Sequence, residues 1–185
     1  MLADRVRSAA MGENPSGGRV ALAAEGAANV STGLPVLDHL VTELARAGRF
    51  KLSLEVAPGG ADEGVVAAGG TLGAAFGERL AAGGAAGRGW SLVPADEALA
   101  LASLERADEP RLVTNVDFSD QRVGGLGTDV ASRFLNELAL AAGLNLHVRL
   151  VEGTDPQHVL AAIFKAVGAA LGQACRPVPE LKEDS

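Results

Sequence analysis

Apolar and polar residues alternate along two stretches of the chain, residues 50–56 and 144–151. Side chains of a half-buried strand point alternately toward the core and toward solvent, so this pattern predicts a strand in each stretch. A helical spacing of apolar residues precedes each strand and ends near a glycine, Gly48 in the first case and Gly143 in the second. Glycine tolerates the left-handed conformation that closes many helices. The pattern therefore predicts a helix followed by a strand at two places.

The same order of elements continues after each predicted strand. The motif Gly-Ala-Ala-x-Gly occurs at residues 73–77 and again at residues 168–172, within a helical pattern. The strands and the glycine motifs are both separated by 94 or 95 residues, which indicates an internal duplication. We therefore expect an α+β fold made of duplicated strand–helix half-domains, with two sheets packed with helices.

The remaining elements follow from the same two periodicities. Strands are expected at 19–24, 50–56, 98–106, 111–118 and 144–151, and helices at 34–47, 65–80, 129–142 and 157–174. The expected domain organisation is a loosely ordered N-terminal arm (1–18), a first half-domain (19–80), a flexible Gly/Ala-rich joint (81–89), a second half-domain (90–175) and a loosely held C-terminal tail (176–185).

The two helices that carry the glycine motifs differ in intrinsic strength. The last helix begins well, because Asp155 is a good N-cap residue and Pro156 suits the first helical position. The helix at 65–80 contains four glycines, each of which costs roughly 1 kcal/mol relative to alanine. It is expected to persist only through close packing, with a distorted or disordered first turn.

Composition and charge narrow the function classes. Hydrophobic residues make up 48% of the chain but aromatic residues only 3%, so helices and strands must pack through small side chains. The formal net charge is −7, and an acidic chain without a basic cluster disfavours nucleic-acid binding. No apolar stretch predicts a membrane span or a signal peptide. A single cysteine, Cys175, rules out an internal disulfide framework and favours the cytoplasm.

Four motifs, in order along the chain, carry a resemblance to a known family. Thr32–Leu40 reads Thr-Gly-Leu-Pro-Val-Leu-Asp-His-Leu, and Val93–Leu99 reads Val-Pro-Ala-Asp-Glu-Ala-Leu. Leu146–Val148 reads Leu-His-Val, and Gly153–Lys165 reads Gly-Thr-Asp-Pro-Gln-His-Val-Leu-Ala-Ala-Ile-Phe-Lys. They resemble signatures of the imidazoleglycerol-phosphate dehydratases, and the resemblance extends over about residues 19–174.

The resemblance implies a fold, an activity and an assembly. Members of this family have a duplicated fold of the ribosomal protein S5 domain 2-like type. They are carbon–oxygen lyases of histidine biosynthesis that remove water from imidazoleglycerol phosphate. Each family site holds two manganese ions, bound by six histidines and two glutamates, at a contact between subunits of a large shell. We therefore expect a homo-oligomer, a trimer or larger, although lost metal ligands would weaken its contacts and leave a dimer open.

Three histidines fall on positions of family metal ligands: His39, His147 and His158. The resemblance makes them the candidate residual metal site. Other interpretations stay open for two of them. His39, beside Asp38 at a helix start, also suits a capping or packing role, and His147 also suits a surface position on the polar face of its strand.

The other ligands that the resemblance implies are replaced. The first family signature, His-His-x-x-Glu, aligns with Val66, Ala67 and Gly70, and in the second signature Gln157 and Ala161 stand for a histidine and the glutamate. Three of eight ligands remain, with no carboxylate to offset the charge of a divalent ion. We therefore expect no cofactor, or a single weakly bound divalent metal in place of the family's manganese pair.

The substrate-binding residues implied by the family are also altered. Lys165 matches the lysine that binds substrate phosphate, and Glu13 matches a substrate-contacting glutamate near the N-terminus. Glu109 stands where the family has a phosphate-binding arginine, and an anion at that position repels phosphate. A solvated surface lysine is the alternative interpretation of Lys165.

Three functions are compatible with these residues. The first is a catalytically inactive homologue with a structural or regulatory role, through self-association or an unknown protein partner. The second is an active lyase with a reduced metal site, completed by a neighbouring subunit. The third is a small-anion or metabolite binder that uses Lys165 and Arg88. Bound metal distinguishes the first two, because only the lyase requires it.

Overall fold

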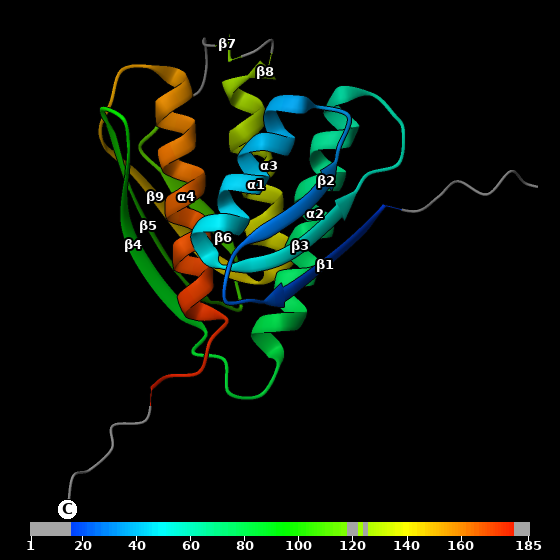
Figure 1. Cartoon of the computed structure of the whole chain (residues 1–185), viewed down its shortest axis with the longest axis vertical. Helices are drawn as coiled ribbons and strands as arrows, with labels where there is room; N and C mark the ends of the chain where they lie inside the picture. Colours follow the sequence, from blue (N-terminus) through cyan, green and yellow to red (C-terminus); the bar gives the residue numbers. More distant parts are fainter. Residues whose placement is uncertain (1–15, 118–121, 124–125, 180–185) are drawn as a thin grey trace, which may run out of the picture.

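The structure is a computed structural model that describes residues 16–117, 122–123 and 126–179 of the 185-residue chain. The described residues form two larger sheets, a two-stranded ribbon and four helices (Figure 1). The helices are α1 (Pro35–Gly48), α2 (Ala61–Ala81), α3 (Thr128–Ala142) and α4 (Pro156–Ala174). The first sheet contains β1 (Gly17–Leu22), β2 (Ala27–Ser31) and β3 (Phe50–Glu55). The second contains β4 (Arg88–Ala95), β5 (Ala98–Arg106), β6 (Arg111–Thr114) and β9 (Leu144–Glu152), and the ribbon pairs β7 (Arg122–Val123) with β8 (Leu126–Gly127).

The two sheets share a three-stranded core with the same topology. In the first sheet, β3 lies between an antiparallel β1 and a parallel β2. In the second, β9 lies between an antiparallel β5 and a parallel β6, and β4 adds an outer strand beside β5. One helix precedes and one follows the central strand in each half. The duplicated α+β fold is therefore confirmed, whereas the boundaries of the half-domains stay a prediction.

The four helices lie between the two sheets. α1 and α2 pack on the first sheet, α3 and α4 pack on the second, and the helices meet as the pairs α1–α4 and α2–α3. In Figure 1 the strands of the first sheet cross in front of the helices, and β4 lies at the left beyond α4. The outer face of each sheet is consequently open to solvent in the single chain. In the described part of the chain, no helix is long and apolar enough to cross a membrane.

Close contacts between helix backbones explain the repeated glycine motif. A Cβ atom on Gly73 would lie 2.5 Å from the carbonyl oxygen of Leu138 in α3, and one on Gly168 would lie 2.1 Å from that of Leu44 in α1. Only glycine permits backbones to approach so closely. This packing stabilises α2, which is helical from Ala61 onward, so the expected distortion of its first turn is wrong.

The helix ends agree with the sequence at two places and differ at one. Gly143 has a left-handed φ of 70° after α3, and Asp155 caps α4 with its side chain, both as predicted. After α1 the left-handed residue is Arg49, with φ 54°, and not Gly48. Gly48 serves packing instead, because a Cβ atom there would lie 2.4 Å from the carbonyl oxygen of Gly168.

The hydrophobic pattern does not predict β2 or β4. β4 begins at Arg88, inside the expected flexible joint, and its buried side carries the small residues Gly89 and Ser91. α4 lies directly on this strand: the Ser91 hydroxyl donates a hydrogen bond of 2.6 Å to the carbonyl oxygen of Ala166. Small inward residues reverse the usual apolar alternation, which hides the strand from a periodicity argument. β6 is also shorter than expected and ends at Thr114.

Arg176 ties the end of α4 to the end of α1. Its guanidinium donates to the carbonyl oxygens of Gly172, at 2.6 Å, and of Gly48 and Arg49, each at 3.0 Å. These carbonyls lie at helix ends, where intrahelical donors are lacking. The first residue of the expected loose tail is therefore firmly bound.

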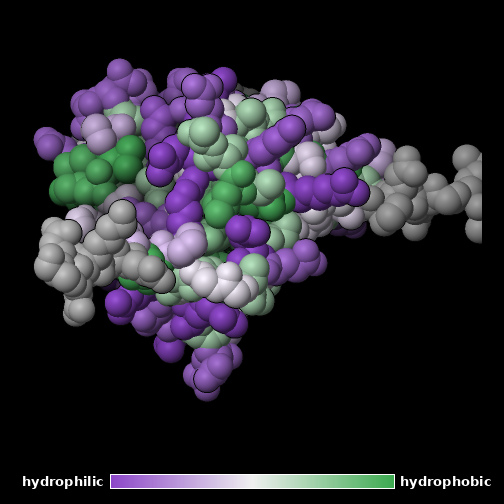
Figure 2. Space-filling model, turned by 60° about the horizontal axis from the view of Figure 1, so that its bottom comes forward, coloured by the Kyte–Doolittle hydropathy of each residue, from purple (hydrophilic) through white to green (hydrophobic). Residues whose placement is uncertain are grey.

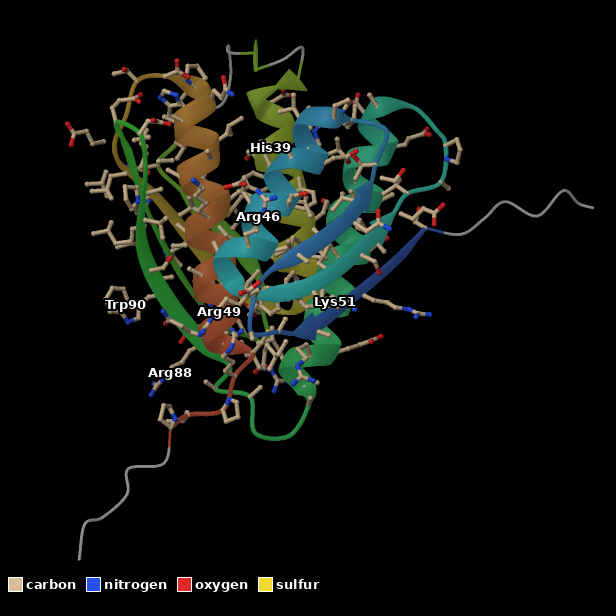
Figure 3. All side chains as sticks on the ribbon, in the orientation of Figure 1. His39, Arg46, Arg49, Lys51, Arg88 and Trp90 are labelled. Atoms are coloured by element: carbon tan, nitrogen blue, oxygen red, sulfur yellow. The ribbon has the colours of Figure 1, made fainter. Side chains whose placement is uncertain are left out.

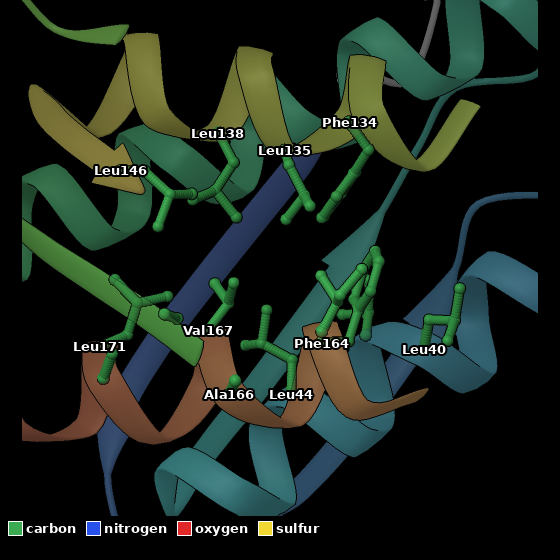
Figure 4. Close-up of a cluster of buried hydrophobic side chains, with 14 of the residues drawn as sticks. Leu40, Leu44, Phe134, Leu135, Leu138, Leu146, Phe164, Ala166, Val167 and Leu171 are labelled. Carbon is green, nitrogen blue, oxygen red and sulfur yellow. The ribbon is translucent and has the colours of Figure 1, made fainter. Parts of the chain in front are cut away.

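The core lies where the helices meet. Apolar side chains of α1, α3 and α4 point toward one another there (Figure 4). The rings of Phe134 and Phe164 stack with their centroids 5.6 Å apart, and Leu44 and Leu135 are fully buried beside them. Seen from its lower end, the surface mixes hydrophilic residues with small hydrophobic areas (Figure 2).

Candidate functional site

A cavity of about 520 Å³ lies between α1, α4 and the turn that joins β4 to β5. α1 contributes His39 to its lining, and α4 contributes Gln157, His158 and Lys165. Each of these residues belongs to a motif that the sequence singled out, and helix packing brings the two motifs together. The cavity is therefore the candidate functional site.

Carboxylates surround the His158 side chain. The N-cap Asp155 sets the first turn of α4 by accepting the N–H of Gln157 at 2.8 Å, which directs the next side chain toward the β4–β5 turn. There Nδ1 of His158 pairs with the Glu97 carboxylate, and Nε2 lies 3.5 Å from Oδ2 of Asp96. Both ring nitrogens thus face acidic groups.

These contacts shift the pKa values of both partners. The hydrogen bond that the His158 ring donates to Glu97, together with the nearby negative charges, raises the pKa of His158 above its ordinary value, because these contacts stabilise the imidazolium. Glu97 moves in the opposite direction: the N–H of Asp155, followed by the His158 ring, lowers its pKa to about 2. Both shifts favour the ionised form of the pair.

Glu97 also holds the backbone in front of α4. Its Oε1 accepts the N–H of Asp155 at 3.0 Å and that of Thr154 at 3.4 Å. Sequence reasoning included Glu97 in a family motif but did not assign it a role. The available signal was the pair Asp96-Glu97 between two strands, where the positive φ of Asp96, 50°, turns the chain.

Lys165 lies at the opposite wall of the cavity and is ion-paired. Its Nζ lies 3.5 Å from Oε2 of Glu43, whose other oxygen accepts a hydrogen bond from Arg46 at 3.0 Å. Both Lys165 and Glu43 are partly buried, so Lys165 is not the freely solvated lysine of the alternative interpretation. Sequence reasoning missed Glu43, because its partner is remote in the chain.

His39 is exposed and is not the residue that caps α1. No side chain of a described residue caps α1; Asp38, the neighbour of His39, instead accepts, through Oδ1, hydrogen bonds from the backbone N–H and the hydroxyl of Thr32 in the turn before the helix. This contact explains the spacing of the Thr-Gly-x-x-x-x-Asp motif in structural terms. His39 is left facing the cavity.

His147 lies away from the other two histidines. It is exposed on the outer face of the second sheet, opposite Ser103 of β5 in the strand register. It lines a different cavity, of about 690 Å³, together with Arg88 and Trp90. The three histidines therefore do not converge within one chain. Lys165 and Arg88 line separate cavities as well, so no single anion can use both.

The positions that the resemblance aligns with the first metal signature carry no metal donor. Val66, Ala67 and Gly70 lie on α2, and Asp62 near the start of that helix is paired with Arg133 at 3.2 Å. Among the described residues, no three His, Cys, Asp or Glu side chains are grouped so as to hold a metal ion. Glu13 lies outside the described residues. The donors that one chain brings together do not fit a pair of manganese ions.

Comparisons with known proteins agree with the sequence motifs. The family model described as imidazoleglycerol-phosphate dehydratase matches residues 32–171, more than half of the chain. A protein of that name from Pelobacter propionicus is 35% identical over 95% of this chain and 94% of its own length. One from Desulfitobacterium hafniense is 38% identical over 85% of this chain and 82% of its own length.

Solved structures show the same fold. The imidazoleglycerol-phosphate dehydratase of Staphylococcus aureus superposes with a TM-score of 0.81 at 25% identity, covering 89% of this chain and 95% of its own. The Pyrococcus furiosus structure superposes with a TM-score of 0.77 at 22% identity and covers 92% of this chain and 95% of its own. The helix and sheet arrangement is thus preserved across the chain.

Proposed function

The chain belongs to the imidazoleglycerol-phosphate dehydratase family, and on that premise we propose that it is a non-catalytic homologue. Its role is structural or regulatory, through self-association or a protein partner. We expect it in the cytoplasm, where enzymes of histidine biosynthesis usually work.

The surroundings of His158 carry this proposal. Its two ring nitrogens face Glu97 and Asp96, and these carboxylates stabilise the protonated ring, so a metal ion would have to displace a proton that the site holds more firmly than usual. His39 is the other histidine at the same cavity, and these histidines and the nearby carboxylates are not grouped, within the described part of the chain, so that three of them could hold one metal ion. The contact of His158 with Glu97 and Asp96 holds α4 against the β4–β5 turn, so His158 has a structural role in place of metal binding.

The charges of the cavity support the same conclusion for the substrate. Lys165, the residue that matches the family's phosphate lysine, is already paired with Glu43. Asp96 adds a second carboxylate to the lining. A phosphate group entering this cavity would meet these carboxylates, while both cationic side chains of the lining, Lys165 and His158, are already paired with carboxylates, which is unfavourable.

Metal counting and a dehydratase assay test the proposal together. The purified protein would be stripped with a chelator, loaded with manganese, and assayed with imidazoleglycerol phosphate beside the Desulfitobacterium hafniense relative as a positive control. We expect less than one tightly bound ion per chain and no turnover, with an unchanged circular dichroism spectrum. Turnover that rises with added manganese and disappears with chelator would overturn the proposal.

An active lyase with a reduced site is the second candidate, and the names of its relatives favour it. His147 is exposed on the outer face of the second sheet, so a second copy of the chain has access to it. If a partner completes the site, His147→Ala and His158→Ala chains are each inactive alone but recover activity when mixed. No recovery, together with an inactive parent protein, removes this candidate.

Exposed apolar residues support self-association. Trp90 is 65% exposed, Leu92 50% and Val151 57%, and all three lie on β4 or β9 at the second sheet. Trp90 and Leu92 project from the same face of β4, with β5 between them and Val151, and exposed apolar side chains that lie together are typical of protein contacts. We expect Leu92→Glu to shift the sedimentation coefficient toward the monomer, whereas Leu140→Glu on α3, 43% exposed in the parent, leaves it unchanged. Equal behaviour of the two variants would exclude this face as the contact.

A further inference from the structure

Two cationic side chains, Arg19 and Lys51, lie with the carboxylate of Glu55 on the outer face of the first sheet, away from the cavity described above. A groove of about 850 Å³ runs over β1, β2 and β3 to the C-terminal half of α2. Three cationic side chains line it, Arg19 from β1, Lys51 from β3 and Arg79 from α2, against one carboxylate, Glu78. In a chain with a formal net charge of −7, this local excess of cations is unexpected.

The strand register places two of these cations close together. Arg19, Ser53 and Asn29 form one row across the three strands, and Lys51 stands between two alanines in the next row. Diagonal neighbours on a sheet are roughly 7–8 Å apart, so one small ligand can reach both charges. Lys51 extends from β3 in Figure 3, well separated from His39 on α1.

The cations of the groove are not neutralised within the described part of the chain. Arg19, Lys51 and Arg79 have no carboxylate within ion-pair distance there, in contrast to Arg46, Arg133 and Lys165. Nε of Arg79 is buried and lacks a hydrogen-bond partner among the described residues. A buried donor without an acceptor is unfavourable, but Nε has no exposed surface for a ligand to reach, so Arg79 contributes to the groove through its charge.

The rest of the lining suits a small organic molecule. Ser53 and Asn29 add neutral polar groups beside Arg19. Ala21 and Ala27 flank Lys51, and their small side chains leave room for a flat ring to approach the sheet. The volume lies within the usual range of ligand pockets, about 300–1,000 Å³.

We propose that this groove is a second binding site, which takes a small phosphate monoester with a flat apolar body. Guanidinium groups recognise phosphate through paired hydrogen bonds, and three cations against one carboxylate match a dianion better than a singly charged carboxylate. The site is distinct from the cavity that holds His158 and Lys165 and does not depend on catalysis there.

A titration of the protein with phenyl phosphate tests the proposal. Binding is measured by calorimetry or by amide chemical shifts, and phenol is the uncharged control. We expect saturable binding of phenyl phosphate and none of phenol. Arg19→Ala and Lys51→Ala should each weaken binding about tenfold, because each removes one charge-assisted hydrogen bond. Both side chains are exposed, so neither variant should change the fold.

Two matched controls separate this groove from the other cavities. Lys165→Gln removes the cation of the α1–α4 cavity, and Arg149→Ala removes one beside His147. Unchanged affinity in both controls supports the proposal. Binding that is lost in Lys165→Gln but retained in Arg19→Ala would overturn it, as would equal binding of phenol or no binding of phenyl phosphate at millimolar concentration.

Discussion

The contact between α1 and α4 depends on a glycine that alanine cannot replace. Gly168 is buried in α4, and a Cβ atom on it would lie 2.1 Å from the carbonyl oxygen of Leu44 and 2.8 Å from its Cα. Real Cβ atoms essentially never lie within 3.0 Å of another heavy atom. Gly168→Ala therefore forces the two helices apart by about 1 Å, against a close-packed interior.

The expected loss of stability combines two opposing effects. Alanine improves the helix by about 1 kcal/mol relative to glycine. Overpacking costs about 1–3 kcal/mol, and here the cost lies at the upper end because the obstacle is backbone on both sides. The net change is a destabilisation of about 2 kcal/mol, or a fall in Tm of about 4–8 °C for a domain of this size.

Gly70 in α2 provides the matched control. It is a helical glycine as well, but a Cβ atom there meets nothing within 4 Å. Gly70→Ala should therefore keep the helix-propensity gain without the clash, and stabilise the protein by about 1 kcal/mol.

Urea unfolding, monitored by circular dichroism, gives the free energy of unfolding of both variants under the same conditions. We expect the unfolding midpoint to fall for Gly168→Ala and to rise for Gly70→Ala, with similar m-values because the buried surface is nearly unchanged. A Gly168→Ala protein as stable as Gly70→Ala would refute the reasoning, since the close approach of α1 and α4 would then not restrict that position.

Three further changes have defined outcomes. Glu97→Gln should lower the pKa of His158 in an NMR titration. In the parent, the raised pKa of His158 stabilises the folded state fully below pH 6.5, and this stabilisation is lost as the pH rises through the pKa of the folded protein. The stabilisation from the lowered pKa of Glu97 is lost as the pH falls toward about 2. An unchanged titration midpoint of His158 in Glu97→Gln would contradict the pairing. Arg176→Ala should reduce the free energy of unfolding by about 1–3 kcal/mol, because it removes the guanidinium donor of the Gly48 and Gly172 carbonyls at the helix ends. Arg88→Ala should change it by less than about 0.5 kcal/mol. Arg49→Gly should raise the free energy of unfolding by about 1 kcal/mol, because it relieves a left-handed backbone at φ 54°; a loss of stability would show that the Arg49 side chain matters more.

Local patterns were sufficient for most of the fold. The strand at 50–56 and the helix at 34–47 are correct to within one residue at each end, because a period of two or 3.6 residues depends only on neighbouring positions. The repeat also gave the duplicated topology. The pattern did not predict β4, because its inward residues are small and the apolar Trp90 and Leu92 point outward.

The candidate site also has features that the sequence predicts and features that only the fold reveals. Which residues replace the family's metal ligands is a property of the sequence, since motif spacing can be compared position by position. The positions of the remaining histidines relative to one another cannot be obtained from motif spacing. His147 and His158 both match ligand positions, yet they occupy different cavities.

The sequence by itself determined the family and the repeat, and it predicts the loss of most metal donors, because each depends on local spacing and residue type. Only the tertiary structure decided what the surviving residues touch. The partner of His158, Glu97, is 61 residues away in the chain, and Glu43 meets Lys165 only because α1 packs against α4. Such contacts depend on the three-dimensional register of helices and sheets, which no local pattern encodes.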